Sequence, residues 1–241
     1  MERKALQKDF DDPDVQAMGF PSIHELWSDE ARRTFGEPAD VHADVAARLD
    51  AERPRAVLDI GCGSGLLKAA LKAPWFGVDV SIEQLKQAGG PSAIADAYAL
   101  PFPDASFDAA ATLYTLYFFD RPDRVADEAF RVLRPGGTFA VCAPSRFDAP
   151  EIDGLAHRDD VDAFASEDIP ELLDGRFVDV EIDEWDFPLL QLRDRQTASD
   201  YLFFWYYPNL SREEAAHHAA SLELPLNLTK KGAWAVGRKP R

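Results

Sequence analysis

The stretch Val57-Leu58-Asp59-Ile60-Gly61-Cys62-Gly63-Ser64-Gly65 decides the fold of this 241-residue chain. β-prone residues and a carboxylate run directly into a glycine loop, and residues 66–71, Leu-Leu-Lys-Ala-Ala-Leu, follow with helical periodicity. A strand that ends in glycines and begins a helix is predicted to present free backbone N–H groups to a nucleotide-like ligand. Glycine is needed at 61, 63 and 65, because a Cβ there would block close approach or forbid the backbone angles.

The spacing of the glycines narrows the class of ligand. A dinucleotide-binding turn has the pattern G-x-G-x-x-G, which would place its third glycine at position 66, and this chain has Leu66 there. The pattern is instead Gly61-x-Gly63-x-Gly65, with Asp59 two residues before it. A nicotinamide-dependent oxidoreductase on the same type of sheet is therefore an alternative interpretation and not the first one.

A second acid ends the next expected strand. Residues 75–79, Trp-Phe-Gly-Val-Asp, form a short apolar run whose last residue, Asp79, lies 18 residues after Gly61. A carboxylate at the end of the second strand of a βαβ unit has two oxygens that accept hydrogen bonds from both ribose hydroxyls. Ser81 is predicted to cap the following helix, which Gly89 and Gly90 cut short after about two turns.

With two further segments, these motifs resemble the class I S-adenosylmethionine-dependent methyltransferases over residues 40–145. The segments are Ala95-Asp96-Ala97, followed by residues 100–108, and residues 130–141, Phe-Arg-Val-Leu-Arg-Pro-Gly-Gly-Thr-Phe-Ala-Val. Within this family the chain is most similar to the small-molecule branch that includes the quinone-biosynthesis methyltransferases. The resemblance implies a Rossmann-like α/β fold: a seven-stranded, mostly parallel sheet with its last strand antiparallel and helices on both faces.

The resemblance also implies S-adenosyl-L-methionine as the cofactor and a set of residues that hold it. Asp79 would accept from the ribose hydroxyls and Asp96 from the adenine amino group, while the backbone of Ala97 would meet a ring nitrogen. The expected cofactor-binding set is Asp59, Gly61, Cys62, Gly63, Gly65, Asp79, Val80, Asp96, Ala97 and Leu113.

The acceptor is expected to lie beyond the fourth strand, where the resemblance places the cofactor sulfonium. Tyr114 and Tyr117 fall at that position and are the candidates for acceptor contact. Methyl transfer needs alignment, apolar walls and in some cases a base. Tyr114, Tyr117 and His157 are the candidates for that base, and none of them stands out. The tetrad Asp-Pro-Pro-Tyr of adenine and glutamine N-methyltransferases is missing from this position.

Two regions flank the expected nucleotide-binding core. Residues 1–54 are predicted to form an N-terminal helical lid or cap with helices over 22–35 and 40–50. Trp27 and Arg32 are candidates for contacts of this lid with the cofactor. The favoured interpretation is that the Trp27 indole is packed and the Arg32 guanidinium is solvated. Residues 55–241 form the expected methyltransferase domain. An aromatic-rich insertion at about 195–224 contains Tyr201-Leu202-Phe203-Phe204-Trp205-Tyr206-Tyr207-Pro208. This run fits two interpretations equally: an aromatic wall over the methyl group or an amphipathic helix that buries its rings.

The C-terminal part is predicted to supply the last two strands. In the first of them, Phe177, Val178, Val180 and Ile182 alternate with acids that are expected to face water. The final strand is expected over residues 226–236, with a bend at Gly232. A helix from Pro122 is predicted to include Leu133 and to end at Gly136 and Gly137.

Composition restricts the partners. The formal net charge is −17, which argues against binding to nucleic acid or to an anionic membrane. Asp outnumbers Glu by 28 to 15 and Arg outnumbers Lys by 18 to 8, a surface typical of salt-adapted, halophilic proteins, with an ordinary acidic enzyme as the alternative.

The remaining features exclude other classes of site. Cys62 and Cys142 have no metal or disulfide spacing, and the histidines form no ligand motif, so no metal is expected. No apolar run is long enough for a membrane helix and the first residues open no signal peptide, so a cytoplasmic location is expected. The sequence thus predicts methyl transfer to a small, apolar or aromatic acceptor, with a non-catalytic binding protein on the same fold as the second alternative. It leaves the oligomeric state open, a homodimer included.

Overall fold

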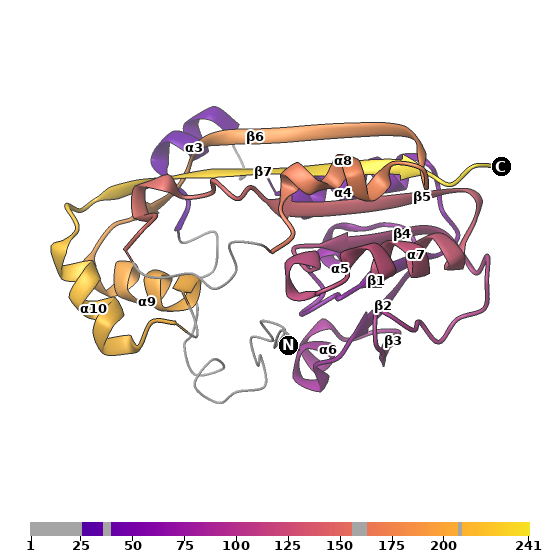
Figure 1. Cartoon of the computed structure of the whole chain (residues 1–241), viewed down its shortest axis with the longest axis horizontal. Coiled ribbons are helices and arrows are strands. Elements are labelled where there is room, and N and C mark those ends of the chain that lie inside the picture. The colour runs from indigo at the N-terminus through magenta and orange to yellow at the C-terminus, as the bar shows by residue number, and fades with distance from the viewer. Residues whose placement is uncertain (1–25, 36–39, 156–162, 207–208) are drawn as a thin grey trace.

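The computed structural model describes residues 26–35, 40–155, 163–206 and 209–241. Its centre is a seven-stranded sheet in the order β3-β2-β1-β4-β5-β7-β6 (Figure 1). The strands are β1 (Val57–Ile60), β2 (Trp75–Asp79), β3 (Ser92–Ile94), β4 (Phe107–Leu113), β5 (Leu133–Pro144), β6 (Val178–Leu192) and β7 (Leu226–Arg238). The first five run parallel, and β7 is antiparallel to both β5 and β6. The predicted fold class is therefore confirmed.

Helices cover both faces of the sheet. The described helices are α3 (Asp29–Phe35), α4 (Val41–Ala51), α5 (Leu66–Ala70), α6 (Ile82–Ala88), α7 (Pro122–Val132), α8 (Ile169–Leu173), α9 (Arg195–Tyr206) and α10 (Arg212–Ser221), with short 3-10 helices η1 (Leu116–Phe118), η2 (Pro150–Ile152) and η3 (Ser166–Asp168). The strand β4 shows the two faces, because Ala109 and Ala111 pack toward α4 and α5, whereas Ala110 packs toward α7 and α8. Alanines along this central strand let the helix layers lie close to the sheet.

A separate apolar cluster lies at the far end of the long β6–β7 pair. The helices α9 and α10 pack there on the end of β6 and the start of β7, away from β1, β2 and β3 (Figure 1). Of the aromatic run in α9, Tyr201, Phe203 and Tyr206 are buried, and the Tyr206 hydroxyl donates to Ile152 O. Most of these rings therefore build a core of their own, which agrees with the second of the two interpretations of the insertion.

The N-terminal helices are partly as predicted. The helix α4 matches the expected second helix, and its residues Val45 and Leu49 are fully buried. The first described helix, α3, spans Asp29–Phe35, the second half of the expected 22–35, and residues 22–25 lie outside the described part. Trp27 is 2% exposed and forms a β-bridge with Leu190. The expected packed indole is thus confirmed, and Trp27 is no free lid.

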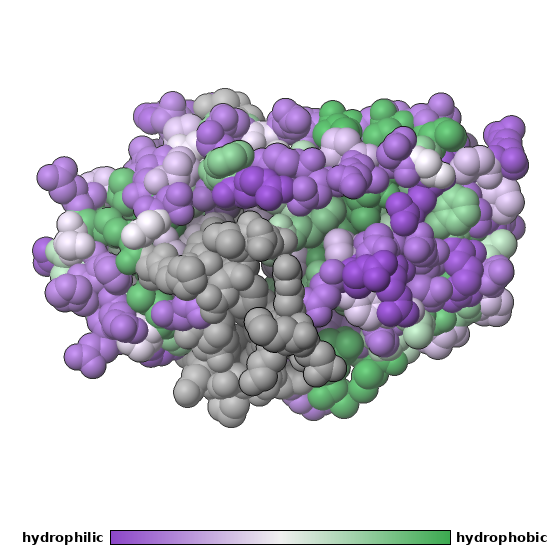
Figure 2. Space-filling model, viewed as in Figure 1, coloured by the Kyte–Doolittle hydropathy of each residue, from purple (hydrophilic) through white to green (hydrophobic). Residues whose placement is uncertain are grey.

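Two expectations about this part of the chain are wrong, whereas the span expected for the final strand lies within β7. Val178, Val180 and Ile182 are 41–46% exposed, because β6 is an edge strand whose first half has little packed against it. Figure 2 shows the corresponding hydrophobic patches along the upper edge of an otherwise largely hydrophilic face. The helix α7 ends at Val132, so that Leu133 and both following glycines belong to β5. β7 continues through position 232, where the Trp185 ring occupies the place of a Cβ.

Candidate active site

The residues expected to bind the cofactor lie along one edge of the sheet, which we call the carboxyl edge. The neighbouring strands β1, β2 and β4 run parallel, so their carboxyl ends meet there. The glycine loop leaves β1 at this edge, Asp79 ends β2, and Tyr114 follows β4. The helix α4 precedes β1 by a short connection and packs back along it, so its first turn also lies at the carboxyl edge.

The glycine loop has the backbone geometry that the sequence predicts. Gly61, Gly63 and Gly65 have φ values of 70°, 49° and 84°, a region that side chains with a Cβ rarely adopt. A Cβ on Gly61 would also lie 2.3 Å from the Thr115 Cγ2 atom. Glycine at this position therefore allows the residues after β4 to pack directly against the loop.

The N–H groups at the start of the loop are not free, contrary to the prediction. Gly61 N and Cys62 N donate to Val78 O at 2.8 and 3.0 Å. Gly63 N donates to Asp79 Oδ2 at 2.9 Å. These bonds tie the loop to the end of β2, so the loop is held in place by the protein and offers a ligand its glycine Cα surface.

Asp79 accepts two backbone hydrogen bonds and retains capacity for more. Its Oδ2 accepts from Gly63 N and its Oδ1 from Ser81 N, each at 2.9 Å. The Ser81 side chain caps α6 as predicted, by accepting from Gln84 N. Because an ionised carboxylate has about four lone-pair positions, each Asp79 oxygen is able to accept one further donor.

Exposed apolar side chains surround Asp79. Val80 follows Asp79 and is 61% exposed. Ile94, the register partner of Asp79 in β3, is 60% exposed. Leu66 and Ile82, at the first turns of α5 and α6, are also exposed. Apolar side chains that border acids in this way suit a ligand with a flat organic ring and hydroxyl groups.

Asp96 lies in a turn at the start of the loop between β3 and β4. The side chain is exposed, and its Oδ1 accepts from Tyr98 N at 2.8 Å in an Asx turn. Ala97 beside it is buried. The Tyr98 hydroxyl accepts from Arg121 N at 3.0 Å, which ties this turn to the start of α7.

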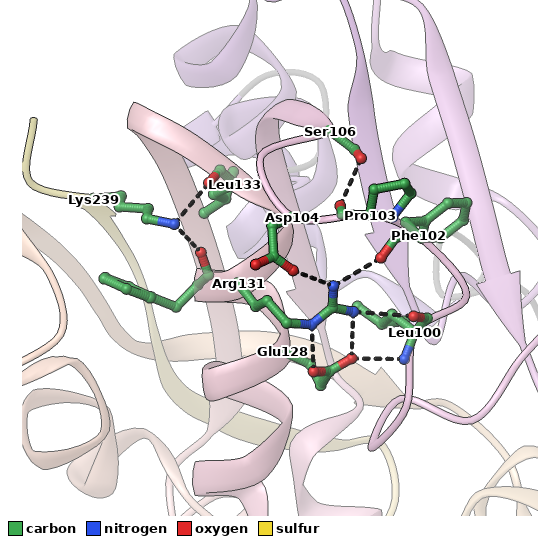
Figure 3. Close-up of polar contacts among 10 residues, drawn as sticks. Leu100, Phe102, Pro103, Asp104, Ser106, Glu128, Arg131, Leu133 and Lys239 are labelled. Carbon is green, nitrogen blue, oxygen red and sulfur yellow. Dashed lines mark hydrogen bonds and ion pairs between the residues drawn. The ribbon is translucent and has the colours of Figure 1, made fainter.

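Arg131, in the last turn of α7, holds the rest of the same loop (Figure 3). Its guanidinium donates to Leu100 O at 3.0 Å and to Phe102 O at 2.7 Å. A further bond of 2.9 Å goes to Asp104 Oδ1. Glu128 accepts from Arg131 Nε and Nη2 at 2.7 and 2.8 Å and from Leu100 N at 2.7 Å. The sequence predicted no role for this ion pair, which fixes the loop that carries Asp96.

Asp59 is a buried acid inside β1. It is 3% exposed, and Trp75 Nε1 donates to its Oδ2 at 3.0 Å. Burial raises the pKa of Asp59 to about 6, while the hydrogen bond from Trp75 and the charge of His42 act in the opposite direction. The Asp59 carboxyl therefore sits beneath the carboxyl edge with a proton affinity well above that of a surface aspartate.

Tyr114 is half-buried at the end of β4, and the two cysteines are buried. Tyr114 has a φ of 54°, and burial followed by the proximity of Cys142 raises its pKa well above the ordinary value. Burial likewise raises the pKa of the Cys62 and Cys142 thiols. These groups keep their protons at neutral pH, which argues against Tyr114 as a base. Leu113 is buried on the face toward α4.

His42 is a site residue that the sequence analysis missed. It lies in the first turn of α4, its ring centroid is 5.7 Å from that of Tyr114, and its charge acts on Asp59. Asp40 caps α4 by accepting from His42 N at 2.9 Å, and His42 Nδ1 lies 3.3 Å from the same oxygen. The sequence signal is an acid at the expected helix start followed two residues later by a histidine.

A buried ion pair lies on the side of the site toward α9. Lys230 in β7 pairs with Asp148, and its Nζ donates to the Tyr201 hydroxyl at 3.2 Å and lies 4.1 Å from the Trp205 ring centroid. Asp148 Oδ1 also accepts from Lys231 N at 2.6 Å. The charge of Asp148 acts on Tyr114, so this cluster adjoins the end of β4.

The structure adds little about the remaining predicted site residues, Tyr117, Arg32 and His157. Tyr117 is half-buried in η1 with its ring centroid 4.4 Å from that of Phe118. Arg32 is exposed on α3, and His157 lies outside the described residues. Among the residues that the structure describes, no group of His, Cys, Asp and Glu is arranged to hold a metal ion. No described helix has the length and apolar character needed to cross a membrane.

Comparison with known proteins identifies the domain. Residues 58–141 match the family model described as a methyltransferase domain. The chain is 34% identical to a fatty-acid O-methyltransferase of Mycolicibacterium smegmatis over 147 residues, 56% of this chain and 51% of that protein. It is 27% identical to a ubiquinone/menaquinone biosynthesis C-methyltransferase of Bartonella henselae over 83% of this chain and 75% of the relative. The chain thus spans about half the length of the first relative and three quarters of the second.

Solved structures share the fold. A SAM-dependent methyltransferase of Thermotoga maritima superimposes with a TM-score of 0.59 at 19% identity, covering 96% of this chain and 98% of that one. The [4+2]-cyclase SpnF gives a TM-score of 0.56 at 25% identity, covering 89% of this chain and 86% of that one. The sheet and its helices are therefore those of the methyltransferase fold. A protein named as a [4+2]-cyclase has the same fold.

Proposed function

Because the chain carries a class I S-adenosylmethionine-dependent methyltransferase domain, whose cofactor is S-adenosyl-L-methionine, we propose that it transfers a methyl group to a small, apolar or aromatic acceptor. One observation carries this proposal: a preorganised glycine loop, two acids and exposed apolar side chains lie together at the carboxyl edge. These groups match the amino-acid, ribose and base portions of such a nucleoside.

The assignment of residues to the cofactor follows from chemistry. Asp79 has the free lone pairs to accept from two hydroxyls. Val80 and Ile94 supply apolar surface for the adenine ring, and Asp96 with Ala97 would form hydrogen bonds with the edge of the adenine. The loop from Gly61 to Gly65 would contact the amino-acid end. Bound there, the cofactor supplies an electrophilic methyl carbon attached to a positively charged sulfur.

The acceptor would lie between the end of β4 and the α9 cluster. Tyr114 lies at the end of β4, and Lys230 with Asp148 fixes Tyr201 and Trp205 at the opposite side. Aromatic and apolar walls exclude water and align an acceptor for in-line attack. We accordingly assign residues 1–54 to a cap, residues 55–241 to the methyltransferase domain and residues 195–224 to an insertion on the acceptor side.

A second function is binding or another reaction without methyl transfer. The likeness to SpnF, a [4+2]-cyclase at 25% identity over most of both chains, favours keeping this candidate. Such a protein would use the same sheet and cofactor cleft. It would bind S-adenosylhomocysteine and leave the methyl group of S-adenosylmethionine in place with every acceptor.

The first experiment is calorimetric titration of the protein with S-adenosylhomocysteine, with NAD as the control ligand. Micromolar binding of the first and none of the second supports the proposal, whereas binding of NAD alone would support an oxidoreductase. The bound protein is then incubated with methyl-labelled S-adenosylmethionine and a panel of carboxylic acids, phenols, quinols and amines. Labelled product identifies a methyltransferase, and its absence across the panel favours the second function.

The partners, the salt adaptation, the location and the oligomeric state of the protein are also proposals. A net charge of −17 disfavours nucleic acid and anionic membranes as partners. The excess of Asp and Arg supports salt adaptation. A cytoplasmic location and an open oligomeric state, with a homodimer as one candidate, remain parts of the proposal. Repeating the titration and a thermal unfolding measurement in low and high salt tests the adaptation, since screening should raise the stability of so acidic a protein. Sedimentation at both salt concentrations gives the oligomeric state.

A further inference from the structure

The first turn of α4 carries an acid and an imidazole in a defined arrangement. Asp40 Oδ1 accepts from the backbone N–H of His42 at 2.9 Å and lies 3.3 Å from its Nδ1. The hydrogen bond with the His42 side chain is the largest contribution that lowers the pKa of Asp40. A carboxylate that accepts from Nδ1–H leaves the Nε2 lone pair of a neutral imidazole for another partner.

The surroundings of His42 place this imidazole at the reaction end of the site. Its side chain is only 18% exposed. Its ring lies beside Tyr114, which directly follows β4, and its charge acts on Asp59 in β1. Asp40 is a further titratable neighbour. One turn along α4, burial and the charges of Asp183 and Asp40 raise the pKa of Asp44. The ring therefore lies close to the end of β4 and near enough to β1 for its charge to act on Asp59.

Two other groups on this side of the molecule, Tyr114 and Lys230, are poor proton acceptors. Tyr114 keeps its proton, because burial raises its pKa. Lys230 is engaged by Asp148, Tyr201 and the Trp205 ring, and the charge of Asp148 and of Tyr201 raises its pKa. Among the described residues at the carboxyl edge, His42 is the basic group with a hydrogen-bonded orienting carboxylate.

We propose that His42, oriented by Asp40, removes the proton from a hydroxyl group of the acceptor during methyl transfer. This inference rests on the proposed methyltransferase function. The acceptor O–H bond breaks and its proton moves to His42 Nε2, while the oxygen forms a bond to the methyl carbon. The bond from this carbon to sulfur breaks at the same time, and sulfur keeps the electron pair and becomes a neutral thioether.

The proposal selects a class of acceptor. A carboxylic acid is already ionised at neutral pH and gains nothing from a base. A phenolic hydroxyl is mostly protonated at that pH, and a positioned base is worth about 10²–10⁴ in rate. The aromatic ring of Tyr114 lies beside His42, and Tyr201 and Trp205 stack on each other in α9. The acceptor class is therefore an aromatic compound with a phenolic hydroxyl.

The test compares three variants with the wild type. His42→Gln removes the base and retains a polar side chain. Asp40→Asn retains an N-cap residue, since asparagine caps helices as well as aspartate does, but removes the charge that orients the imidazole. His217→Gln on the exposed side of α10 is the matched control. Each is titrated with S-adenosylhomocysteine and with 5′-methylthioadenosine, which lacks the amino-acid end, and each is assayed with 2-naphthol and with dodecanoic acid.

We expect the wild type to methylate 2-naphthol. His42→Gln should lower kcat about 10²-fold or more and leave KM and both nucleoside affinities unchanged. Asp40→Asn should lower kcat by a smaller factor, also without a change in KM, and the control should match the wild type.

Two results would overturn the proposal. Methylation of dodecanoic acid alone, or of neither probe by protein that binds S-adenosylhomocysteine, would reject the acceptor class. A His42→Gln variant that binds S-adenosylhomocysteine more weakly but 5′-methylthioadenosine normally would show that His42 holds the cofactor's amino-acid end instead. Failure of the wild type to bind either nucleoside would contradict the methyltransferase function itself, which keeps the two failures distinguishable.

Discussion

Trp75 Nε1, at the start of β2, donates a 3.0 Å hydrogen bond to Asp59 Oδ2 in the neighbouring strand β1. Both side chains are buried beneath the glycine loop. A neutral indole donor stabilises a carboxylate less than a guanidinium would, so this bond offsets only part of the desolvation. The desolvation that the hydrogen bond does not offset raises the pKa of Asp59 to about 6. The apoprotein thus keeps a partly uncompensated acid next to the cofactor loop.

The first prediction concerns the pH dependence of stability. Because the pKa of Asp59 is about 6 when folded and 3.8 in its ordinary state, the folded protein binds this proton more tightly between those values. The contribution of Asp59 to stability is therefore greatest at low pH and falls as pH rises from about 4 to 6, by at most roughly 3 kcal/mol.

The variant Asp59→Asn should lack this pH dependence. Urea unfolding of both proteins at about pH 4.5 and 7.5 measures it: the variant should gain stability relative to wild type on going to the higher pH. Taking the difference between the two proteins cancels the other carboxylates. An equal difference at both pH values would mean that Asp59 is not the group responsible.

The second prediction concerns the Arg131 network in Figure 3. Arg131→Met removes the donors to Leu100 O and Phe102 O and leaves Glu128 without its cationic partner. We expect a loss of about 1–3 kcal/mol in stability, faster amide exchange in the loop after Asp96 and weaker binding of S-adenosylhomocysteine. Hydrogen exchange by mass spectrometry and calorimetry measure these effects.

The control separates a local effect from general destabilisation. S-Ribosylhomocysteine, which lacks adenine, should bind Arg131→Met and wild type equally if the network positions only the adenine-reading loop. Arg131→Lys keeps the charge but not the planar fork, so it should lie between the two proteins. Equal weakening of both ligands would indicate a loss of the whole cleft instead.

The sequence predicted the parts of the site that depend on local backbone chemistry. Gly61 and Gly63 require a positive φ, and Ser81 and Gly89 bound α6 where capping rules place them. Each of these features is encoded within a few residues. The resemblance to a known family then supplied the mostly parallel sheet with its antiparallel last strand, which local rules alone do not give.

The features that the sequence did not predict depend on contacts between distant segments. His42 approaches Tyr114 only because α4 packs back along β1, and a lone histidine shows no spacing that reveals this. Alternation along β6 indicates two faces but not whether anything covers them, so the exposure of Val180 was missed. Likewise, glycine spacing gives the shape of the loop and not the partners of its N–H groups, such as Val78 O.

The third prediction concerns the buried Lys230–Asp148 pair. Lys230→Met leaves the Asp148 carboxylate, which is almost fully buried, without its cationic partner. Removing one member of a buried pair costs about 3–5 kcal/mol. The double variant Lys230→Met with Asp148→Asn should recover much of this loss. Chemical denaturation of the two single variants and the double variant measures the coupling, and a double variant as unstable as the sum of the singles would contradict it.

The last prediction concerns Asp79. Asp79→Ala removes the acceptor for two ribose hydroxyls, each charge-assisted bond being worth roughly 1.5–3 kcal/mol, so the affinity for S-adenosylhomocysteine should fall at least about tenfold. The same change frees Gly63 N and Ser81 N, which Asp79 holds at 2.9 Å, and this could loosen the loop. Adenosine and 2′,3′-dideoxyadenosine separate the two effects, because only the first offers hydroxyl donors. Wild type should prefer adenosine, and Asp79→Ala should bind the two compounds alike. If the variant kept the preference for adenosine, another residue would hold the ribose, and the weakening of S-adenosylhomocysteine would come from the disturbed loop.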